Sequence, residues 1–365
     1  MVFRILALPR HDRLGASSRM RFFQFFPFLE AQGLKICVAP LLPDEYLRSY
    51  YAGRPINWVR LVIAYLRRLP ILFQVRKFDL IWIEKELFPN LPAWPEMLLR
   101  RLGVPYVVDY DDAIFHNYDL SNNPLKKLLA RKIDKVMHAA ELVVCGNAYL
   151  AERARQAGAR RVEILPTVID LRRYAVRRRP QGKPPYDPQH ERIIIGWVGS
   201  PPSSKYLQGI TPVLQRLASK FPVQLRVIGA QFSVPGLDVE CRAWTEENEV
   251  AEIQDFDIGI MPLQGSPWEQ GKCGYKLIQY MACGVPCVAS PIGVNGAIIN
   301  NSVNGYLASN MEGWFAALDS LCLDADARRS MGDKGRLMVE QTYCLQVTAP
   351  RLAKLLAEVI TIEAA

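Results

Sequence analysis

Short apolar runs and stretches of helical spacing alternate along the whole chain. Five compact apolar runs predict strands in the first half: Phe3–Leu8, Lys35–Ala39, Leu80–Ile83, Tyr106–Val108 and Leu142–Cys145. Between them, apolar residues three and four positions apart predict helices, for example over Ser18–Ala31 and Pro124–Ala139. Strands that alternate with helices favour a parallel sheet with helical crossovers.

The second half repeats this pattern. Its predicted strands are Ile193–Val198, Gln224–Ile228, Ile258–Pro262 and Pro286–Ala289, and its predicted helices are Leu207–Lys220, Tyr275–Met281 and Met311–Cys322. A final amphipathic helix is expected from Thr348 to Ala365. A chain of 365 residues usually forms two domains. The proline-rich and charged segment 177–188 is the predicted linker, so we expect domains over 1–180 and 181–345, followed by a helix over 346–365.

Charge is divided unevenly between the halves. Residues 1–180 carry 30 basic and 17 acidic side chains (net +13), and the remainder carries 15 and 19 (net −4). Only the first half is therefore expected to meet an anionic surface. Residues 18–29 and 58–78 place arginines beside large apolar side chains. Such segments suit contact with an anionic membrane, or core helices whose arginines reach solvent.

Other features narrow the class of protein. The chain starts without the pattern of a signal peptide, and no run of about twenty uncharged apolar residues predicts a membrane-spanning helix. The eight cysteines are scattered without a CxxC pair, which favours free thiols in a reducing cytoplasm over a zinc site. We expect a cytoplasmic protein, with a place at the inner face of the membrane if the basic half binds lipid.

The segment 257–293 is the most informative part of the chain. It predicts a strand, a glycine-rich loop, a helix, a sharp turn and a second strand. A loop that leads into a helix N-terminus offers backbone N–H groups and a positive dipole end to a phosphate. Lys272 and Lys276 flank Gly274 and Tyr275 there, and their charges suit a diphosphate. A nucleotide sugar is the natural ligand.

Three predicted strand ends in the first half carry polar residues. Gly15 and Arg19 follow the first strand, in a loop that faces substrate or serves only as a helix cap. Glu84 belongs to the segment Glu84-Lys85-Glu86, which is expected either as exposed, solvated charge or as part of a substrate site. Asp111, Asp112 and His116 follow the fourth strand, where they contact sugar or acceptor, cap a helix, or form an Asp-x-Asp metal site with Asp109.

The segment 281–286, MACGVP, resembles the donor-site segment of the family-four retaining glycosyltransferases, which have the GT-B fold. The loop from Lys272 to Lys276, KCGYK, is similar to that of a bacterial subgroup, and Val303 to Leu307 is similar to the closing motif of the family. The resemblance implies two Rossmann-like domains whose parallel sheets face a central cleft. It also implies that the final helix crosses back to the first domain.

The same comparison shows where this chain departs from the family. The family has two glutamates eight positions apart, and here those positions hold Gly271 and Gln279, although Glu269 lies close to the first. Gln279 can still hydrogen-bond a ribose hydroxyl. The family's Gly-Arg pair corresponds to Gly199 and Ser200, and its following lysine to Lys205. The resemblance therefore implies phosphate contact by Lys205, with Lys272 or Lys276 as the second cation. The turn at Arg242 resembles the base-binding turn.

The predicted function is transfer of a sugar from a nucleotide diphosphate donor to a glycan or lipid-linked acceptor, with retention of configuration, as in polysaccharide biosynthesis. No cofactor or metal and no nucleic acid is expected. The alternatives are an inverting GT-B transferase or nucleotide-sugar epimerase, and a non-catalytic GT-B binding subunit. The loss of both glutamates and the arginine favours the last of these.

Overall fold

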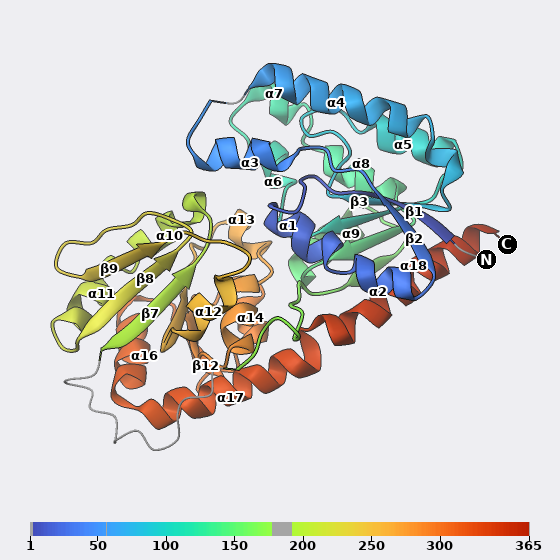
Figure 1. Cartoon of the computed structure of the whole chain (residues 1–365). Coiled ribbons are helices and arrows are strands. Elements are labelled where there is room, and N and C mark those ends of the chain that lie inside the picture. Colours follow the sequence, from blue (N-terminus) through green and yellow to red (C-terminus); the bar gives the residue numbers. More distant parts are fainter. Residues whose placement is uncertain (1–2, 56, 177–191, 365) are drawn as a thin grey trace. The chain divides into compact units, whose positions relative to one another are not determined.

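A computed structural model describes residues 3–55, 57–176 and 192–364 of the chain (Figure 1). The chain divides into two compact units. Unit 1 consists of Met1–Thr167, Gln270–Cys273 and Leu345–Ala365, and unit 2 of Val168–Glu269 and Gly274–Cys344. The crossing at Thr167 precedes the boundary at residue 180 that the sequence suggested. The predicted linker, 177–188, lies outside the described residues.

Unit 1 contains a six-stranded parallel sheet in the order β2-β1-β3-β4-β5-β6. The strands are β1 (Phe3–Leu8), β2 (Leu34–Val38), β3 (Leu80–Glu84), β4 (Tyr106–Tyr110), β5 (Leu142–Cys145) and β6 (Val162–Ile164). The helices are α1 (Ala16–Ser18), α2 (Phe26–Ala31), α3 (Asp44–Tyr51), α4 (Trp58–Leu72), α5 (Trp94–Arg101), α6 (His116–Asp119), α7 (Pro124–Lys127), α8 (Lys132–Ala139), α9 (Ala148–Gln156) and α18 (Leu345–Ala364). All five predicted strands are confirmed. The strands β3, β4 and β5 are apolar runs buried on both faces, whereas β2 at the edge of the sheet is only partly buried.

Unit 2 repeats the architecture with a sheet in the order β12-β11-β10-β7-β8-β9. Its strands are β7 (Ile193–Val198), β8 (Val223–Ile228), β9 (Asp238–Arg242), β10 (Ile258–Met261), β11 (Cys287–Ala289) and β12 (Gly305–Leu307). Its helices are α10 (Lys205–Gln208), α11 (Thr211–Ala218), α12 (Glu249–Gln254), α13 (Pro267–Gln270), α14 (Tyr275–Ala282), α15 (Asn295–Ile298), α16 (Met311–Leu323) and α17 (Ala325–Thr342). One buried cluster joins the sheet to α11 and α16, and a second joins it to α12 and α14.

Glycines in the strands of unit 2 make room for aromatic rings on the same sheet. A Cβ added at Gly196 in β7 would lie 2.0 Å from the ring of Phe256. One added at Gly259 in β10 would lie 2.4 Å from the ring of Tyr280. The Tyr280 hydroxyl accepts a hydrogen bond from the Val198 backbone N–H at 3.0 Å. This close packing fixes α14 against the strand ends from which the site is built.

Both sheets change direction once in the order of their strands. In unit 1 the change lies between β1 and β3, and in unit 2 between β7 and β10. Ligands of open parallel sheets bind outside the carboxyl ends of the strands at such a switch point. The loops that follow these four strands are therefore where chemistry is sought.

Two predicted helices are broken in the structure. Ser18–Ala31 forms α1, a π-helical turn over Arg19–Phe23, and α2, whose first turn contains Pro27. Proline has no N–H to continue the preceding ladder, so the helix restarts there. Pro124–Ala139 likewise separates into α7 and α8. The stretch 58–78 forms α4 and then a 3₁₀ turn over Val75–Lys77.

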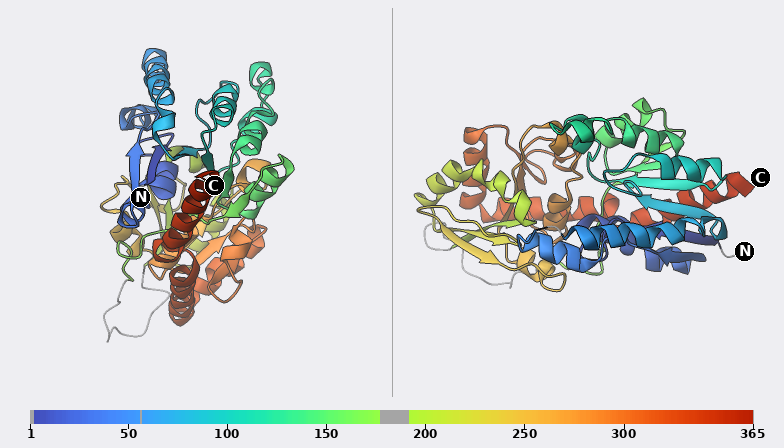
Figure 2. Two further views of the ribbon diagram at one scale, coloured as in Figure 1. Left: turned by 90° about the vertical axis from the view of Figure 1, so that its right-hand side faces the viewer. Right: turned by 90° about the horizontal axis from the view of Figure 1, so that it is seen from above.

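The C-terminal helix α18 packs against α2 and β3 of unit 1. Although it comes last in the sequence, this helix therefore belongs to unit 1. On another side of unit 1, α4 (blue), α5 (cyan) and the α7–α8 pair (green) project together, as the left-hand view of Figure 2 shows. No helix in the described part of the chain is both long enough and apolar enough to cross a bilayer.

Candidate functional site

The carboxyl ends of β1 and β3 are joined by a buried carboxylate in unit 1. Glu84 ends β3, and its Oε2 accepts hydrogen bonds from the Ser18 hydroxyl at 2.6 Å and the Arg10 backbone N–H at 2.8 Å. The Ser18 hydroxyl also accepts a hydrogen bond from the His11 N–H at 3.0 Å. Burial raises the pKa of Glu84. This carboxylate positions the loop that follows β1.

Lys85 is the central cation of unit 1. Its Nζ lies 2.8 Å from Asp111, 3.4 Å from Asp112 and 3.0 Å from the Ser17 hydroxyl. Burial lowers the pKa of Lys85, but Asp111 and Asp112 outweigh burial and raise it. The residue has a φ of 64°, which is unfavourable for a lysine side chain. Strain of this kind is tolerated where a site requires it.

Asp112 carries a second cation. The Nζ of Lys272 lies 2.7 Å from Asp112 Oδ1. Burial alone would raise the pKa of Asp112, but Lys272 and Lys85 hold it at about 2. The amide of Asn147 donates to the Lys272 carbonyl at 3.1 Å, which ties segment 270–273 to the end of β5. Lys272 therefore belongs to unit 1, whereas Gly274, Tyr275 and Lys276 belong to unit 2.

The expectation that Glu84-Lys85-Glu86 is an exposed, solvated loop is wrong. The three residues are 1%, 5% and 3% exposed. The Glu86 carboxylate pairs with Lys132 and accepts a hydrogen bond from the Tyr118 hydroxyl at 2.8 Å. A charged triplet looks solvent-exposed in a sequence because its buried counter-ions come from distant segments.

Asp109 lies within β4, before Asp111 and Asp112, and its carboxylate is ion-paired with Arg21. Its carboxylate accepts hydrogen bonds from Arg21 at 2.7 and 3.1 Å, and both side chains are almost fully buried. Arg21 also donates to the Leu165 carbonyl at 2.8 Å. Burial raises the pKa of Asp109 to about 6, although Arg21 opposes that effect. The pair joins the π-helical turn to the sheet. Among the described residues, no group of three or more His, Cys, Asp or Glu is placed to hold a metal ion.

His11 is the residue at this site that the sequence analysis missed. Its ring stacks on Tyr46 at a centroid distance of 6.1 Å. Burial, with help from Arg10 and Lys85, lowers its pKa to about 3, so the ring is neutral near pH 7. A Cβ added at Gly15 would lie 2.4 Å from the His11 Cβ, which explains why glycine is needed there. The signal in the sequence was its place three residues after β1.

Two further predicted residues have other partners. His116 contacts Asp119 through Nδ1 and the Tyr149 hydroxyl through Nε2, both at 2.8 Å, so the structure does not place it with Lys85. Arg19 is 4% exposed and donates to the Arg13 carbonyl at 3.0 Å. Both residues hold local structure.

In unit 2, residues from the carboxyl end of β7 and from the first turn of α14 both lie near the indole ring of Trp197. A Cβ added at Gly199 would lie 2.6 Å from the ring of Trp197. The Lys276 ammonium lies 5.4 Å from the centroid of the same ring. Gly274 has a φ of 65° at the N-cap of α14, and it has no side chain to cover the first turn. The Lys276 ammonium and the N-terminus of α14 thus lie near the end of β7, where Gly199 follows the strand at the switch point. This arrangement suits a phosphate.

The loop before α14 is held by Glu269. This carboxylate is 3% exposed, accepts a hydrogen bond from the Tyr206 hydroxyl at 2.6 Å and contacts the Ser266 hydroxyl. At Gly271, where the resemblance implies a glutamate, an added Cβ would lie 2.5 Å from the Cβ of Ala113. No side chain fits there without a shift of the backbone.

Gln279 is part of a buried hydrogen-bonded chain. Its amide donates to the Tyr174 hydroxyl at 3.0 Å, which donates to Glu249 at 2.6 Å. Glu249 also accepts from the Trp244 indole N–H at 2.5 Å. The Tyr275 hydroxyl lies 3.5 Å from that of Tyr174. Gln279 therefore helps to hold the hydrogen-bonded side chains of Tyr174, Glu249 and Trp244 in place.

The remaining predicted donor residues lie at the ends of β7 and β9. Ser200 precedes a 3₁₀ turn over Pro201–Ser203, and its carbonyl accepts from the Ser203 N–H at 2.9 Å. Lys205 opens α10 on the surface, with its Nζ 5.2 Å from the centroid of the Tyr206 ring. Arg242 forms ion pairs with Glu240 at 2.8 Å and Glu252 at 2.5 Å.

Comparison with known proteins agrees with this geometry. Residues 16–167 match the family described as glycosyl transferase 4-like domain, and residues 192–324 match glycosyl transferases group 1. Together the two matches cover most of the chain. They place the chain among the GT-B glycosyltransferases, with a group 1 domain as its second half.

The chain is also similar to individual proteins. It is 23% identical over 193 residues to the N-acetyl-alpha-D-glucosaminyl L-malate synthase of Bacillus anthracis, and the match covers 50% of this chain and 50% of that relative. Sucrose-phosphate synthase from Thermosynechococcus elongatus has a similar fold, with a TM-score of 0.71, 14% identity and coverage of 99% of this chain and 100% of the other. HepE from Anabaena, in complex with UDP and glucose, has a TM-score of 0.65 at 14% identity, with coverage of 98% and 100%. These structures confirm the predicted two-domain α/β fold.

Proposed function

We propose that this protein is a retaining glycosyltransferase that uses a nucleotide diphosphate sugar. The observation that carries the proposal is the meeting of Gly199, Lys276 and the N-terminus of α14 at Trp197, at the switch point of the unit 2 sheet. A cation and oriented amides stabilise charge that develops on a leaving diphosphate. The similar fold of HepE, which was solved with UDP and glucose, supports the same ligand class.

Unit 1 supplies the acceptor side in this proposal. Lys85, Asp111 and Asp112 form a compact charged cluster at the strand ends, with Glu84 and Ser18 holding the loop beside it. Carboxylates and an ammonium group can bind the hydroxyls of a sugar. A glycan or lipid-linked acceptor fits the polar cluster together with the basic, apolar surface of this unit.

Retention is supported because the carboxylates at the end of β4 are paired with cations, which weakens each of them as the general base that inversion would need. Asp109 is ion-paired with Arg21, Asp111 with Lys85 and Asp112 with Lys272, so each carboxylate already has a cation within 3 Å. The leaving phosphate then serves as the base for the acceptor hydroxyl. An inverting transferase is the alternative, and it needs a general base. His11 is a poor candidate for that base, because burial lowers its pKa to about 3 and a group of such low pKa takes up a proton only weakly near pH 7.

A donor screen followed by product analysis tests this function. We expect one or more nucleotide diphosphate sugars to raise the melting temperature, since a ligand that binds only the folded state stabilises it. Transfer to an acceptor should then give a product with the anomeric configuration of the donor, which NMR reads directly. An inverted product would identify the alternative. A protein that binds donor but neither transfers nor hydrolyses it would be a binding subunit.

Lys276→Ala, with Lys220→Ala as its control, ties the result to the site. Lys220 is a lysine of the same unit that pairs with Asp319 on the surface, away from the strand ends. We expect the Lys276 variant alone to lose transfer. Equal activity of both variants would remove Lys276 from the proposed site.

We further propose that unit 1 binds anionic membranes at the cytoplasmic face, as its net positive charge suggests. Not every arginine of the segment 58–78 is available for this contact. Arg68 is 2% exposed and donates to the carbonyls of Leu87, Pro9 and Ala39 at 2.7 to 3.1 Å, so it cannot contact lipid. Co-sedimentation with anionic and neutral vesicles at low and high salt tests the contact, because screening weakens it.

A further inference from the structure

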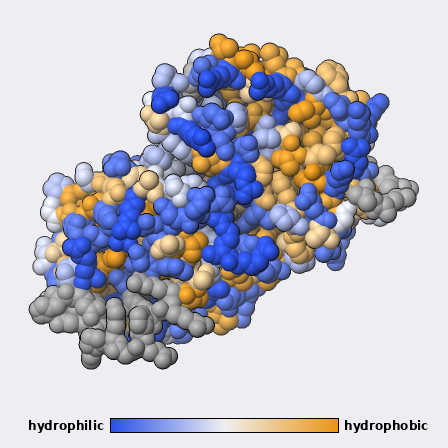
Figure 3. Space-filling view, in the orientation of Figure 1, coloured by the Kyte–Doolittle hydropathy of each residue, from blue (hydrophilic) through white to orange (hydrophobic). Residues whose placement is uncertain are grey.

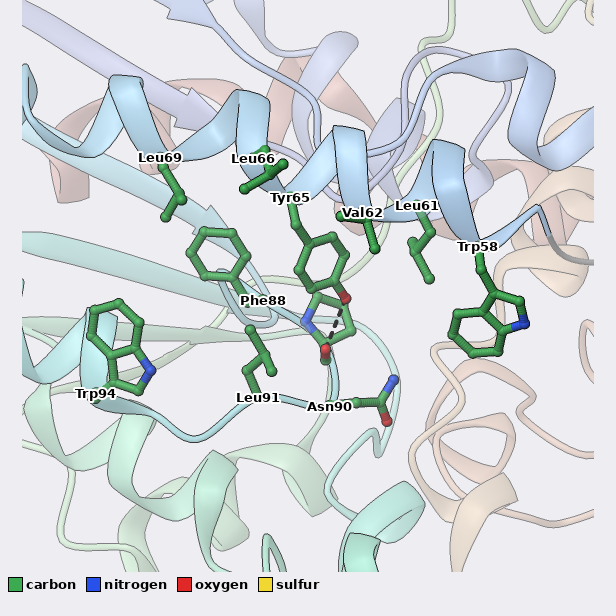
Figure 4. Close-up of a pocket in the computed structure, with 11 residues that line it drawn as sticks. Trp58, Leu61, Val62, Tyr65, Leu66, Leu69, Phe88, Asn90, Leu91 and Trp94 are labelled. Atoms are coloured by element: carbon green, nitrogen blue, oxygen red, sulfur yellow. Dashed lines mark hydrogen bonds between the residues drawn. The ribbon is translucent and has the colours of Figure 1, made fainter.

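An apolar groove of about 450 Å³ runs between α4 and the segment from Phe88 to Trp94 in unit 1 (Figure 4). Its lining is Trp58, Leu61, Val62, Tyr65, Leu66, Leu69, Phe88, Pro89, Asn90, Leu91 and Trp94. The volume is within the range of small-molecule pockets. The Tyr65 hydroxyl, a polar atom of this lining, donates to the Pro89 carbonyl at 2.8 Å. The groove therefore presents mainly hydrocarbon to a ligand.

The sequence of α4 builds this groove as one of three faces. The lining positions of α4 are three and four residues apart, from Trp58 to Leu69, and so lie on one side of the helix. Ala64 and Arg68 lie on the buried side. Val59 and Ile63 are exposed and lie outside the groove. An ordinary surface helix would carry polar residues at these positions.

Exposed apolar side chains continue around the groove. Trp58 is 69% exposed, Val62 55%, Leu66 56% and Trp94 53%. Figure 3 shows such apolar side chains gathered over α4 and α7, with strongly hydrophilic ones among them. Large exposed apolar side chains gathered in this way mark a binding or membrane surface. Tryptophans are favoured at the boundary between lipid and water.

The charges beside this surface are mainly basic. On the two helices beside it, α4 and α5, the exposed charged residues are Arg60, Arg67, Arg100 and Arg101, all of them basic. One helical turn from Trp94, Met97 and the end of α5 line a second cavity of about 690 Å³. Its charged lining is Arg100, Arg101, Arg131, Asp134, Lys135 and His138, and Asp134 pairs with Arg153. The occupant must therefore combine a hydrocarbon part with a negative charge.

We propose that the groove between α4 and residues 88–94 binds the hydrocarbon chain of an anionic membrane lipid. The headgroup then lies toward the arginines of α4 and α5, and the exposed face of α4 enters the membrane interface. The inference deepens the proposed membrane contact of unit 1 and rests on it for the source of the lipid. An apolar protein segment would fill the groove equally well but would leave the basic cavity beside α5 without a counter-charge.

Soluble single-chain phosphates test the groove without a membrane. Dodecyl phosphate and octyl phosphate, each below the concentration at which it forms micelles, are titrated into the full chain and followed by calorimetry and tryptophan fluorescence. Each buried methylene contributes roughly fourfold in affinity. We expect dodecyl phosphate to bind at least tenfold more tightly than octyl phosphate, and inorganic phosphate to give no fluorescence change. Equal binding of the two alkyl phosphates would overturn the proposal.

Val62→Asp and Val59→Asp form a matched pair on α4. Both positions are exposed, at 55% and 68%, so both variants should fold, which their thermal melts check. Only Val62 lines the groove. We expect Val62→Asp to lose at least tenfold in affinity for dodecyl phosphate and Val59→Asp to stay within twofold. Equal losses would indicate an open apolar surface and would refute a groove.

Vesicles separate this inference from the proposed membrane contact. Both variants should weaken co-sedimentation with anionic vesicles, because both place a carboxylate on an exposed part of α4. In one outcome, the unmodified protein binds alkyl phosphates in a way that depends on chain length and that only Val62→Asp removes, and yet binds no vesicles. That pair of results would refute the membrane contact but would leave the groove as a binding site for a hydrocarbon chain. Vesicle binding without any binding of alkyl phosphate would refute the groove alone.

Discussion

The neutrality of His11 gives a prediction that can be worked from the structure. Burial lowers its pKa from an ordinary value of 6.5 to about 3. The unfolded chain therefore binds a proton at this ring in a pH range where the folded protein does not. The folded state is therefore not destabilised by His11 above pH 6.5, and the free energy of unfolding falls progressively as the pH is lowered from 6.5 toward 3.

The magnitude follows from the two pKa values. At pH 7.5 the ring is almost entirely neutral in both states, and His11 has almost no effect on pH dependence. At pH 5 the unfolded state is protonated and the folded state is not, which lowers the free energy of unfolding by about 2 kcal/mol. His11→Gln removes this titration. The difference in unfolding free energy between the variant and the unmodified protein should change by that amount between the two pH values.

Two measurements check this reasoning. Urea unfolding of both proteins at pH 7.5 and pH 5, with hydrogen exchange of β1 and β3 to assign the change to unit 1, gives the difference in free energy. NMR of the four histidines gives the pKa directly, with His11→Gln as the assignment. A His11 resonance that titrates near pH 6.5 would refute the reasoning, and so would equal pH dependence of the two proteins.

The remaining predictions concern the charged groups. Lys205→Ala and Lys276→Ala should each slow transfer by about 10²–10³ with a smaller effect on donor affinity, as steady-state kinetics and calorimetry would show. Wild-type turnover of both would refute the phosphate site. Transfer activity should survive treatment with a chelator. Loss of activity that added manganese or magnesium restores would instead support an Asp-x-Asp metal site. Arg68→Met should lower the free energy of unfolding by about 3–5 kcal/mol, because three buried carbonyls lose their donor, and denaturant unfolding measures it. An unchanged midpoint would contradict that role.

The fold could be predicted because its strands are short apolar runs and its helices have regular spacing. The five strands predicted in unit 1 required no knowledge of their partners. The strand β6 was missed because it has three residues, all of them only partly buried. The break between α1 and α2 was also missed, although Pro27 was visible, since the length of a helix depends on the packing around it.

The site was less predictable because its charges are satisfied from distant segments. Lys85 pairs with residues 26 and 27 positions later in the chain, and Asp112 pairs with Lys272. A sequence shows Glu84-Lys85-Glu86 as a charged run and cannot show that the sheet brings counter-ions to it. His11 was missed for a different reason: its place three residues after β1 was visible, but nothing local reveals that its ring is buried.

At the two positions where the resemblance implies glutamates, Gly271 and Gln279, the surroundings give a separate physical reason for the residue that is present. At Gly271 an added side chain would collide with Ala113, so the loop here is built for close backbone packing. At Gln279 an amide replaces a carboxylate within hydrogen-bonding distance of Tyr174, whose hydroxyl already donates to Glu249. A second buried carboxylate beside Glu249 would add repulsion in a site with little solvent, whereas the neutral amide donates a hydrogen bond to the same network. Both replacements are therefore accommodated by their surroundings, and Glu249 keeps a buried carboxylate next to α14.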